Sequence, residues 1–111
     1  MVKRKADVEI KKIIESYIAK ISQYYMVDAV YLFGSFANGN QDEDSDIDIA
    51  VISKDIKNEI DDMGKLFALT RGIDTRIEPH PIRTEEFRNR ETPFIDEIIR
   101  TGIPIRFNVS N

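Results

Sequence analysis

Apolar residues recur along this chain with two different periods, and the changes of period divide it into helices and strands. Over residues 6 to about 25, apolar side chains return every three or four positions with Lys, Glu and Gln between them, which predicts a helix with one buried face. We expect its tyrosines to lie in the core and at its rim, an exposed partner-binding surface being the alternative. The apolar positions are Ile10, Ile13, Ile14, Tyr17, Ile18, Ile21, Tyr24 and Tyr25.

Two short apolar runs follow and predict a pair of buried strands. The first covers residues 30–33 and is broken by Gly34 and Ser35, and the second covers residues 45–52. Between them we expect a helical turn at residues 36–39 and a solvated acidic loop at residues 42–44.

The middle of the chain predicts a second helix and a third strand. Residues 55–71 have the helical period, and Gly72 suits the end of this helix. Its inner face is predicted to hold Ile56, Ile60, Met63 and Phe67. Residues 73–82 alternate between apolar and polar side chains, as a strand does. Because Pro79 and Pro81 lack an N–H group, this strand should end there or lie at the edge of the sheet.

Two shorter helices and a last strand, at residues 103–107, complete the pattern. Thr84 offers an N-cap hydroxyl to the first of these helices. Thr92 and Pro93 begin the second, and Gly102 ends it. The apolar face of the second helix is predicted to hold Phe94, Ile95, Ile98 and Ile99. This order of elements predicts an α/β (α+β) fold in which a small mixed β-sheet is flanked by helices.

Length and composition are those of an ordinary globular protein. The chain has 111 residues, 41% of them hydrophobic and 32% charged, which predicts one domain spanning residues 1–111. A net charge of −4 argues against binding to a long nucleic acid. The chain has no cysteine, and no apolar run reaches the roughly 20 residues of a membrane span. The cytoplasm is therefore the expected location.

The candidate chemistry begins in the second predicted strand. Asp46 and Asp48 are two residues apart, so a strand directs both carboxylates to one face, while Ile47 and Ile49 point into the core. Carboxylates on an apolar strand are costly to bury unless they are neutralised. Mg²⁺ meets this need, because it binds one or two carboxylates together with the phosphates of a substrate. The alternative is a pair of exposed acids on an edge strand.

Gly34 and Ser35 supply the second half of the candidate site. They end a strand and begin a short helix, where unpaired backbone N–H groups attract phosphate. Glycine lets a phosphate approach closely, and the serine hydroxyl can donate a hydrogen bond to it. The arrangement Gly-Ser-x10-Asp-x-Asp thus combines a phosphate-binding turn with a metal-binding pair, as phosphoryl or nucleotidyl transfer requires.

This stretch resembles the signature of the polymerase β-like nucleotidyltransferase superfamily, through Gly34, Ser35, Asp46 and Asp48. The short chain resembles the minimal, stand-alone members, many of which are encoded beside a HEPN-domain protein as a toxin–antitoxin pair. Larger members hold their acceptor with an additional helical domain, a surface that a partner chain can supply here. The resemblance implies the polymerase β-like nucleotidyltransferase fold.

The resemblance also implies an activity and the residues for it. Such an enzyme transfers NMP, typically AMP, from an NTP such as ATP to a hydroxyl group and releases pyrophosphate. Gly34 and Ser35 would bind the β- and γ-phosphates. Asp46 and Asp48 would be catalytic ligands of two Mg²⁺ ions. The family's third carboxylate, an aspartate in many members, corresponds to Glu78, which would bind metal and help to deprotonate the acceptor.

The implied acceptor is a HEPN toxin, so the chain would act as an antitoxin, and both homo- and hetero-oligomers are open. Asp74 is the runner-up for the third carboxylate, and the alternative for Glu78 is a surface salt bridge with Arg76. His80, the only histidine, lies between two prolines and is interpreted as a loop residue. The alternative functions are a non-catalytic antitoxin, binding through surfaces such as the face of Tyr17 and Tyr24, and a subunit of an antibiotic- or sugar-modifying nucleotidyltransferase.

Overall fold

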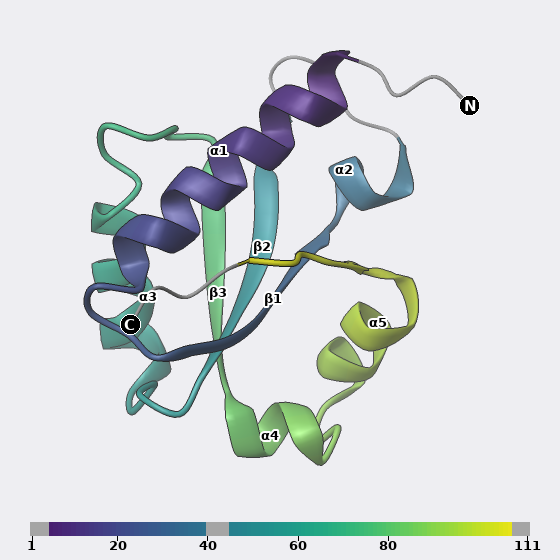
Figure 1. Ribbon diagram of the computed structural model, residues 1–111. Coiled ribbons are helices and arrows are strands. Elements are labelled where there is room, and N and C mark those ends of the chain that lie inside the picture. The colour runs from purple at the N-terminus through teal and green to yellow at the C-terminus, as the bar shows by residue number, and fades with distance from the viewer. Residues whose placement is uncertain (1–4, 40–44, 108–111) are drawn as a thin grey trace.

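The computed structural model describes residues 5–39 and 45–107, which form a four-stranded sheet flanked by helices (Figure 1). The strands are β1 (Val27–Phe33), β2 (Ile47–Ser53), β3 (Ile77–Arg83) and β4 (Ile103–Pro104). The helices are α1 (Lys5–Ile21), α2 (Ser35–Asn38), α3 (Glu59–Ala68), α4 (Thr84–Arg88) and α5 (Pro93–Thr101). The predicted order of elements is confirmed, and the loop predicted at residues 42–44 lies outside the described residues.

The sheet has the strand order β3-β2-β1-β4 and is mixed, as predicted. β1 runs antiparallel to both β2 and β4, whereas β2 runs parallel to β3. β3 is therefore an edge strand, which confirms one of the two positions predicted from Pro79 and Pro81. The parallel register aligns Asp48 of β2 with Glu78 of β3.

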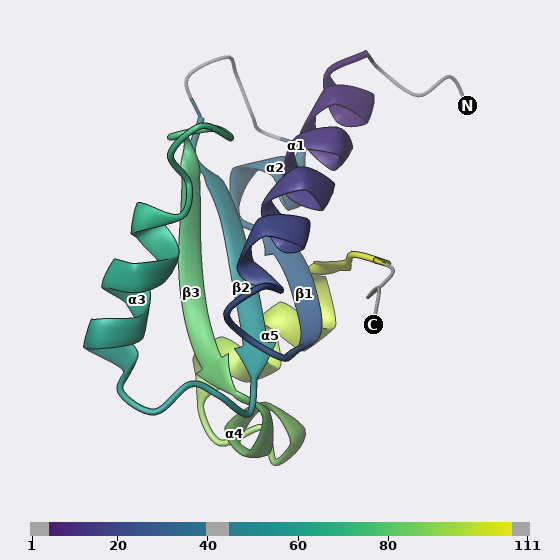
Figure 2. The ribbon, with the colours of Figure 1, turned by 60° about the vertical axis from the view of Figure 1, so that its left-hand side comes forward.

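Helices cover both faces of the sheet (Figure 2), and each face has its own cluster of buried apolar side chains. α1 and α3 pack on one face, where Ile14 and Ile49 are fully buried. α5 packs on the other face, where Ile98 meets Ala50. Neighbouring residues of β2 thus point into different cores, because side chains alternate along a strand. No helix in the described ranges is long and apolar enough to cross a membrane.

The tyrosines of the first predicted helix separate into core and surface residues. α1 ends at Ile21, so Tyr24 and Tyr25 lie beyond it. Tyr17 is fully buried and its hydroxyl donates a hydrogen bond to the Leu66 carbonyl oxygen at 2.6 Å, which joins α1 to α3. Tyr24 is 65% exposed. The expectation that the tyrosines lie in the core and at its rim fits Tyr17 and Tyr25, and the alternative of one exposed face holding Tyr17 and Tyr24 is wrong.

The predicted inner face of the second helix is wrong except at Ile56, which is buried in the core but lies before α3 begins. Ile60, Met63 and Phe67 are 85%, 41% and 55% exposed, while Asp62 and Leu66 are buried. A buried aspartate explains the difference, because its carboxylate has partners on the inner side of the helix. These partners are the Tyr25 hydroxyl at 2.7 Å and the backbone N–H groups of Lys57 at 2.9 Å and Asn58 at 3.1 Å.

Several element boundaries differ from the predictions for local reasons. The Asn58 side chain accepts hydrogen bonds from two backbone N–H groups, so α3 begins at Glu59 and not at residue 55. Its C-cap is Leu69, three residues before Gly72. Hydrogen-bonded turns occupy the residues before Ile77, which shortens the third strand. The last strand contains two of its five predicted residues.

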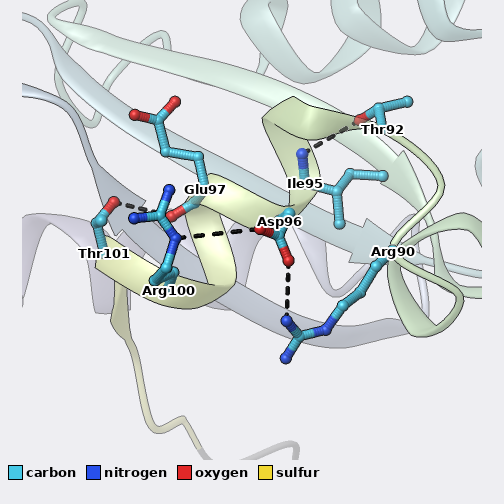
Figure 3. Close-up of polar contacts among 7 residues, drawn as sticks. All are labelled: Arg90, Thr92, Ile95, Asp96, Glu97, Arg100 and Thr101. Carbon is cyan, nitrogen blue, oxygen red and sulfur yellow. Dashed lines mark hydrogen bonds and ion pairs between the residues drawn. The ribbon is translucent and has the colours of Figure 1, made fainter.

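The start of α5 is confirmed in detail (Figure 3). Pro93 is its first residue, and the Thr92 side chain accepts a hydrogen bond from the Ile95 N–H at 3.1 Å. Asp96 accepts a hydrogen bond from Arg90 at 2.9 Å, which ties the helix to the preceding turn. Thr84, in contrast, is not an N-cap: it is the first residue of α4, and its hydroxyl donates to the Asp28 carboxylate.

Candidate active site

The predicted site residues lie in a row across three strands. Phe33, the last residue of β1, is the cross-strand partner of Asp48 in β2, and Asp48 is in turn the partner of Glu78 in β3. Gly34 and Ser35 follow β1 directly and begin α2. The sheet therefore brings three separate segments together, with Asp48 in the middle.

The centre of this row is a compact group of three side chains, Asp48, Glu78 and His80. One ligand atom from each lies within 4.8 Å of the others. His80 Nε2 is 3.4 Å from Asp48 Oδ1 and 3.8 Å from Glu78 Oε1. The Asp48 and His80 side chains are each 23% exposed and that of Glu78 is 49% exposed, so the group is open to solvent on one side.

Asp46 lies at the margin of this group. It is an exposed residue directly before β2, and its side chain forms a hydrogen bond with Glu78. The pKa of the Glu78 carboxyl is raised above its ordinary value, first by partial burial, then by the nearby charge of Asp48 and by the hydrogen bond with Asp46. Negative charge is therefore crowded here, and a cation would relieve that crowding.

Gly34 lies directly against Asp48, so the two halves of the motif are in contact. Its φ is +74° with ψ −147°, a backbone conformation open almost only to glycine. A Cβ atom at this position would lie 2.4 Å from Asp48 Oδ2. Two features therefore require glycine at position 34: the backbone conformation and the close approach of the Asp48 carboxylate.

His80 was missed as a site residue, and its interpretation as a loop residue is wrong. It lies within β3, on the same face as Glu78, because the two residues are two positions apart. Its ring packs against Phe33 and Phe94, with ring centroids 5.0 Å and 5.9 Å away. The sequence did contain an indication of this position: His80 is two residues from Glu78, so a strand would direct both side chains to one face. The flanking Pro79 and Pro81 argued against a continued strand there.

Asp74, the runner-up for the third carboxylate, is engaged elsewhere. It lies in the turn before β3 and binds the Arg76 guanidinium through two contacts, at 2.8 Å and 3.1 Å. Hydrogen bonds from the Arg76 side chain lower the pKa of Asp74, against the opposing effect of burial. Because Arg76 makes this bidentate contact, the geometry favours Glu78 and not Asp74 as the partner of Asp48.

The donor set fits a divalent cation. Two carboxylates and one imidazole converge from neighbouring strands, and all three residue types are common metal ligands. Ligands bound about 2.1 Å from an ion and at right angles to each other are about 3 Å apart, which is close to the 3.4 Å between His80 and Asp48. Because Gly34 has no side chain, the Asp48 carboxylate can lie where a Cβ atom would otherwise be.

A family assignment follows from comparison with known proteins. Residues 10–108 match the family described as polymerase beta, nucleotidyltransferase. The chain belongs to this family. The nucleotidyltransferase identity inferred from Gly34, Ser35, Asp46 and Asp48 is thereby confirmed, as is the polymerase β-like fold.

Individual relatives of this nucleotidyltransferase agree with the assignment. A Methanocaldococcus jannaschii chain, MJ0141, named as a candidate protein adenylyltransferase, is 31% identical over 104 residues, which cover 87% of this chain and 99% of the relative. The crystal structure of a candidate nucleotidyltransferase from Sulfolobus solfataricus is 28% identical, with a TM-score of 0.59 and coverage of 81% and 84%. A toxin–antitoxin crystal structure with AMP-PNP is 25% identical, with a TM-score of 0.57 and coverage of 92% of this chain and 73% of that one.

Proposed function

We propose that this nucleotidyltransferase transfers AMP from ATP, with Mg²⁺, to a hydroxyl group on a HEPN toxin and so acts as its antitoxin. The carrying observation is the contact between Gly34 and Asp48, which places the turn proposed to bind phosphate against the carboxylates. The name of the MJ0141 relative supports adenylyl transfer to protein, and the solved toxin–antitoxin structure supports a toxin as partner.

Each residue of the row has a proposed role. Gly34 and Ser35 bind the β- and γ-phosphates of ATP, because the start of α2 presents backbone N–H groups there. Asp46, Asp48 and Glu78 hold two Mg²⁺ ions. When bound, the ions neutralise phosphate charge and make the acceptor hydroxyl more acidic. Glu78 stands where it can take up the acceptor proton, since its side chain is half exposed.

The order of these residues across the sheet gives the side from which the acceptor comes. Phosphoryl transfer runs in line, with the attacking and leaving oxygens on opposite sides of the phosphorus. Pyrophosphate held at Gly34 and Ser35 leaves on the β1 side of Asp48, so the acceptor approaches from the β3 side.

A hollow of about 310 Å³ opens on that side. Its lining includes His80 of β3, Met63 of α3 and Phe94 of α5, and Glu59 and Glu86 supply carboxylates. Small-molecule and side-chain sites commonly have this mixture of an apolar lining and a few polar groups. We assign the hollow to the acceptor residue of the partner protein.

The decisive experiment is the double substitution Asp46→Asn with Asp48→Asn. It removes two charges and keeps side-chain volume, so circular dichroism should show an unchanged fold. Transfer of label from the α-phosphate of ATP to the proposed HEPN partner protein should fall by at least about 10²-fold. Asp74→Asn is the matched control, because Asp74 is bound to Arg76 outside the group and its loss should leave transfer intact.

Two outcomes would overturn the proposal. A folded double variant that still neutralises the toxin would show that the chain acts by binding alone. Label transfer to an aminoglycoside or a sugar phosphate, with none to the toxin, would show that the acceptor is a small molecule.

A further inference from the structure

The only histidine of the chain stands inside the candidate metal site, although the family signature gives it no role. His80 Nε2 is 3.4 Å from Asp48 Oδ1, closer than its 3.8 Å distance from Glu78 Oε1. Asp46, which the signature does include, is absent from the group of converging ligand atoms found among the described residues. The geometry thus offers two oxygen donors and one nitrogen donor at the centre of the site.

The His80 ring is held in place from several directions. Its backbone pairs with Ala50 of the central strand. The ring makes an edge contact with Phe33 and a tilted contact with Phe94. A ligand oriented by its surroundings loses little conformational freedom when it binds a metal.

The Asp48 carboxylate is also oriented toward the ring. Its Oδ2 lies over the Cα of Gly34, at the point where a Cβ atom would be 2.4 Å away. Its Oδ1 faces His80 Nε2. Two ligands of one ion are about 3.0–3.3 Å apart for metal–ligand distances near 2.0–2.1 Å, so a movement of a few tenths of an ångström brings both atoms into coordination.

We infer that His80 binds the divalent cation directly through Nε2. This inference rests on the proposed function, because it takes a metal at Asp48 and Glu78 as given. An imidazole ligand favours ions with affinity for nitrogen, such as Co²⁺ and Zn²⁺, over Mg²⁺, which prefers oxygen ligands. The chain should therefore bind Co²⁺ more tightly than an all-carboxylate site would.

Electron spin echo spectroscopy of the protein loaded with Mn²⁺, after removal of any purification tag, tests the bond itself. Nitrogen modulation of the imidazole type is expected, and it must come from His80 because the sequence contains no other histidine. His80→Phe keeps an aromatic ring against Phe33 and Phe94 and should abolish the modulation. His80→Gln serves as the second variant if the first one is unstable. Asp74→Asn should leave the modulation unchanged.

Calorimetry gives an independent measurement. His80→Phe should weaken Co²⁺ binding by about tenfold or more while changing Mg²⁺ binding much less. Bound Mn²⁺ without nitrogen modulation, or equal losses of Co²⁺ and Mg²⁺ affinity, would overturn the role of His80 and leave the proposed function intact. No Mn²⁺ binding at all, with or without ATP, would overturn the metal site and the proposed function together.

Discussion

At the scale of single residues, the candidate site depends on the packing of Gly34 against Asp48, because the Asp48 carboxylate lies where a side chain at position 34 would be. Gly34 and Asp48 belong to two halves of a sequence motif separated by more than a dozen positions, yet the carboxylate lies where the glycine lacks a side chain. The motif therefore describes one packed unit, in which a side chain at position 34 would displace the Asp48 carboxylate.

The substitution Gly34→Ala should harm both activity and stability. The backbone conformation costs an alanine about 1–3 kcal/mol, which urea unfolding will measure. The new methyl group would also displace Asp48, so label transfer should fall well beyond the loss of folded protein. Gly39→Ala is the matched control: φ is also positive there, but nothing lies within 4 Å of the added atom. Equal losses of transfer in the two variants would contradict this account.

The sequence predicts residue types at the site better than it predicts which of them meet. Gly34 and Asp48 are predicted from their spacing and Glu78 from the family resemblance, and the structure places them in one row. The choice of Glu78 over Asp74 and the presence of His80 depend on the register between β2 and β3. A local pattern does not contain this register, because it is set by the packing of whole strands.

At the scale of elements, α3 shows how one buried polar group can override an apolar pattern. The periodicity predicted a face containing Ile60 and Phe67, but the helix turns Asp62 and Leu66 inward. Burial would raise the pKa of Asp62, yet the hydrogen bonds from the Tyr25 hydroxyl and two backbone N–H groups outweigh it and lower that pKa. Periodicity fails here because it counts only apolar positions.

Truncation of α3 side chains will test this orientation. Leu66→Ala should lower the free energy of unfolding by about 2–5 kcal/mol, because the leucine is fully buried. Ile60→Ala should change it by about 0.5 kcal/mol or less, since the isoleucine is 85% exposed. Urea denaturation of both variants gives the comparison, and a larger loss for Ile60→Ala would show that the helix is turned the other way.

The Asp62 cluster also predicts a dependence of stability on pH. A carboxylate whose pKa is lowered by folding stabilises the native state above its unfolded pKa of about 3.9, and this contribution disappears as pH falls through the folded pKa. Tyr25→Phe removes one hydrogen bond and should cost about 1.5–3 kcal/mol at neutral pH. The difference in the free energy of unfolding between this variant and the wild type should shrink below about pH 3, as measured by urea titrations. If the difference in the free energy of unfolding stays constant from about pH 2 to 7, Asp62 is not the source of the pH dependence.

At the scale of the whole molecule, the sheet order separates the two proposed binding regions. The proposed ATP phosphates lie at the end of β1, and the hollow beyond β3 lies on the opposite side of Asp48. Acceptor binding and nucleotide binding should therefore respond to different substitutions.

Met63→Asp will test this separation. Met63 lines the hollow and is 41% exposed, so an added charge should disturb the acceptor and not the fold. We expect kcat/KM for transfer to the toxin to fall about tenfold, equivalent to about 1.4 kcal/mol, with an unchanged Kd for ATP. Ile60→Asp, one turn away on the same helix and outside the hollow, is the control. A weakened Kd for ATP in Met63→Asp alone would place the nucleotide in the hollow.

The prolines of the edge strand have a consequence for how the molecule meets other chains. Pro79 and Pro81 have no N–H group, so the N–H groups that β3 donates to β2 belong to the residues between and beside them. The two prolines therefore leave the outer edge of β3 without two of its backbone donors. The opposite edge, β4, is two residues long and also contains a proline. In the part of the chain that the structure describes, neither edge offers the row of free donors that recruits a strand from another polypeptide. Within the described residues, the β3 edge beside the candidate site is therefore poorly suited to strand addition or amyloid-like pairing.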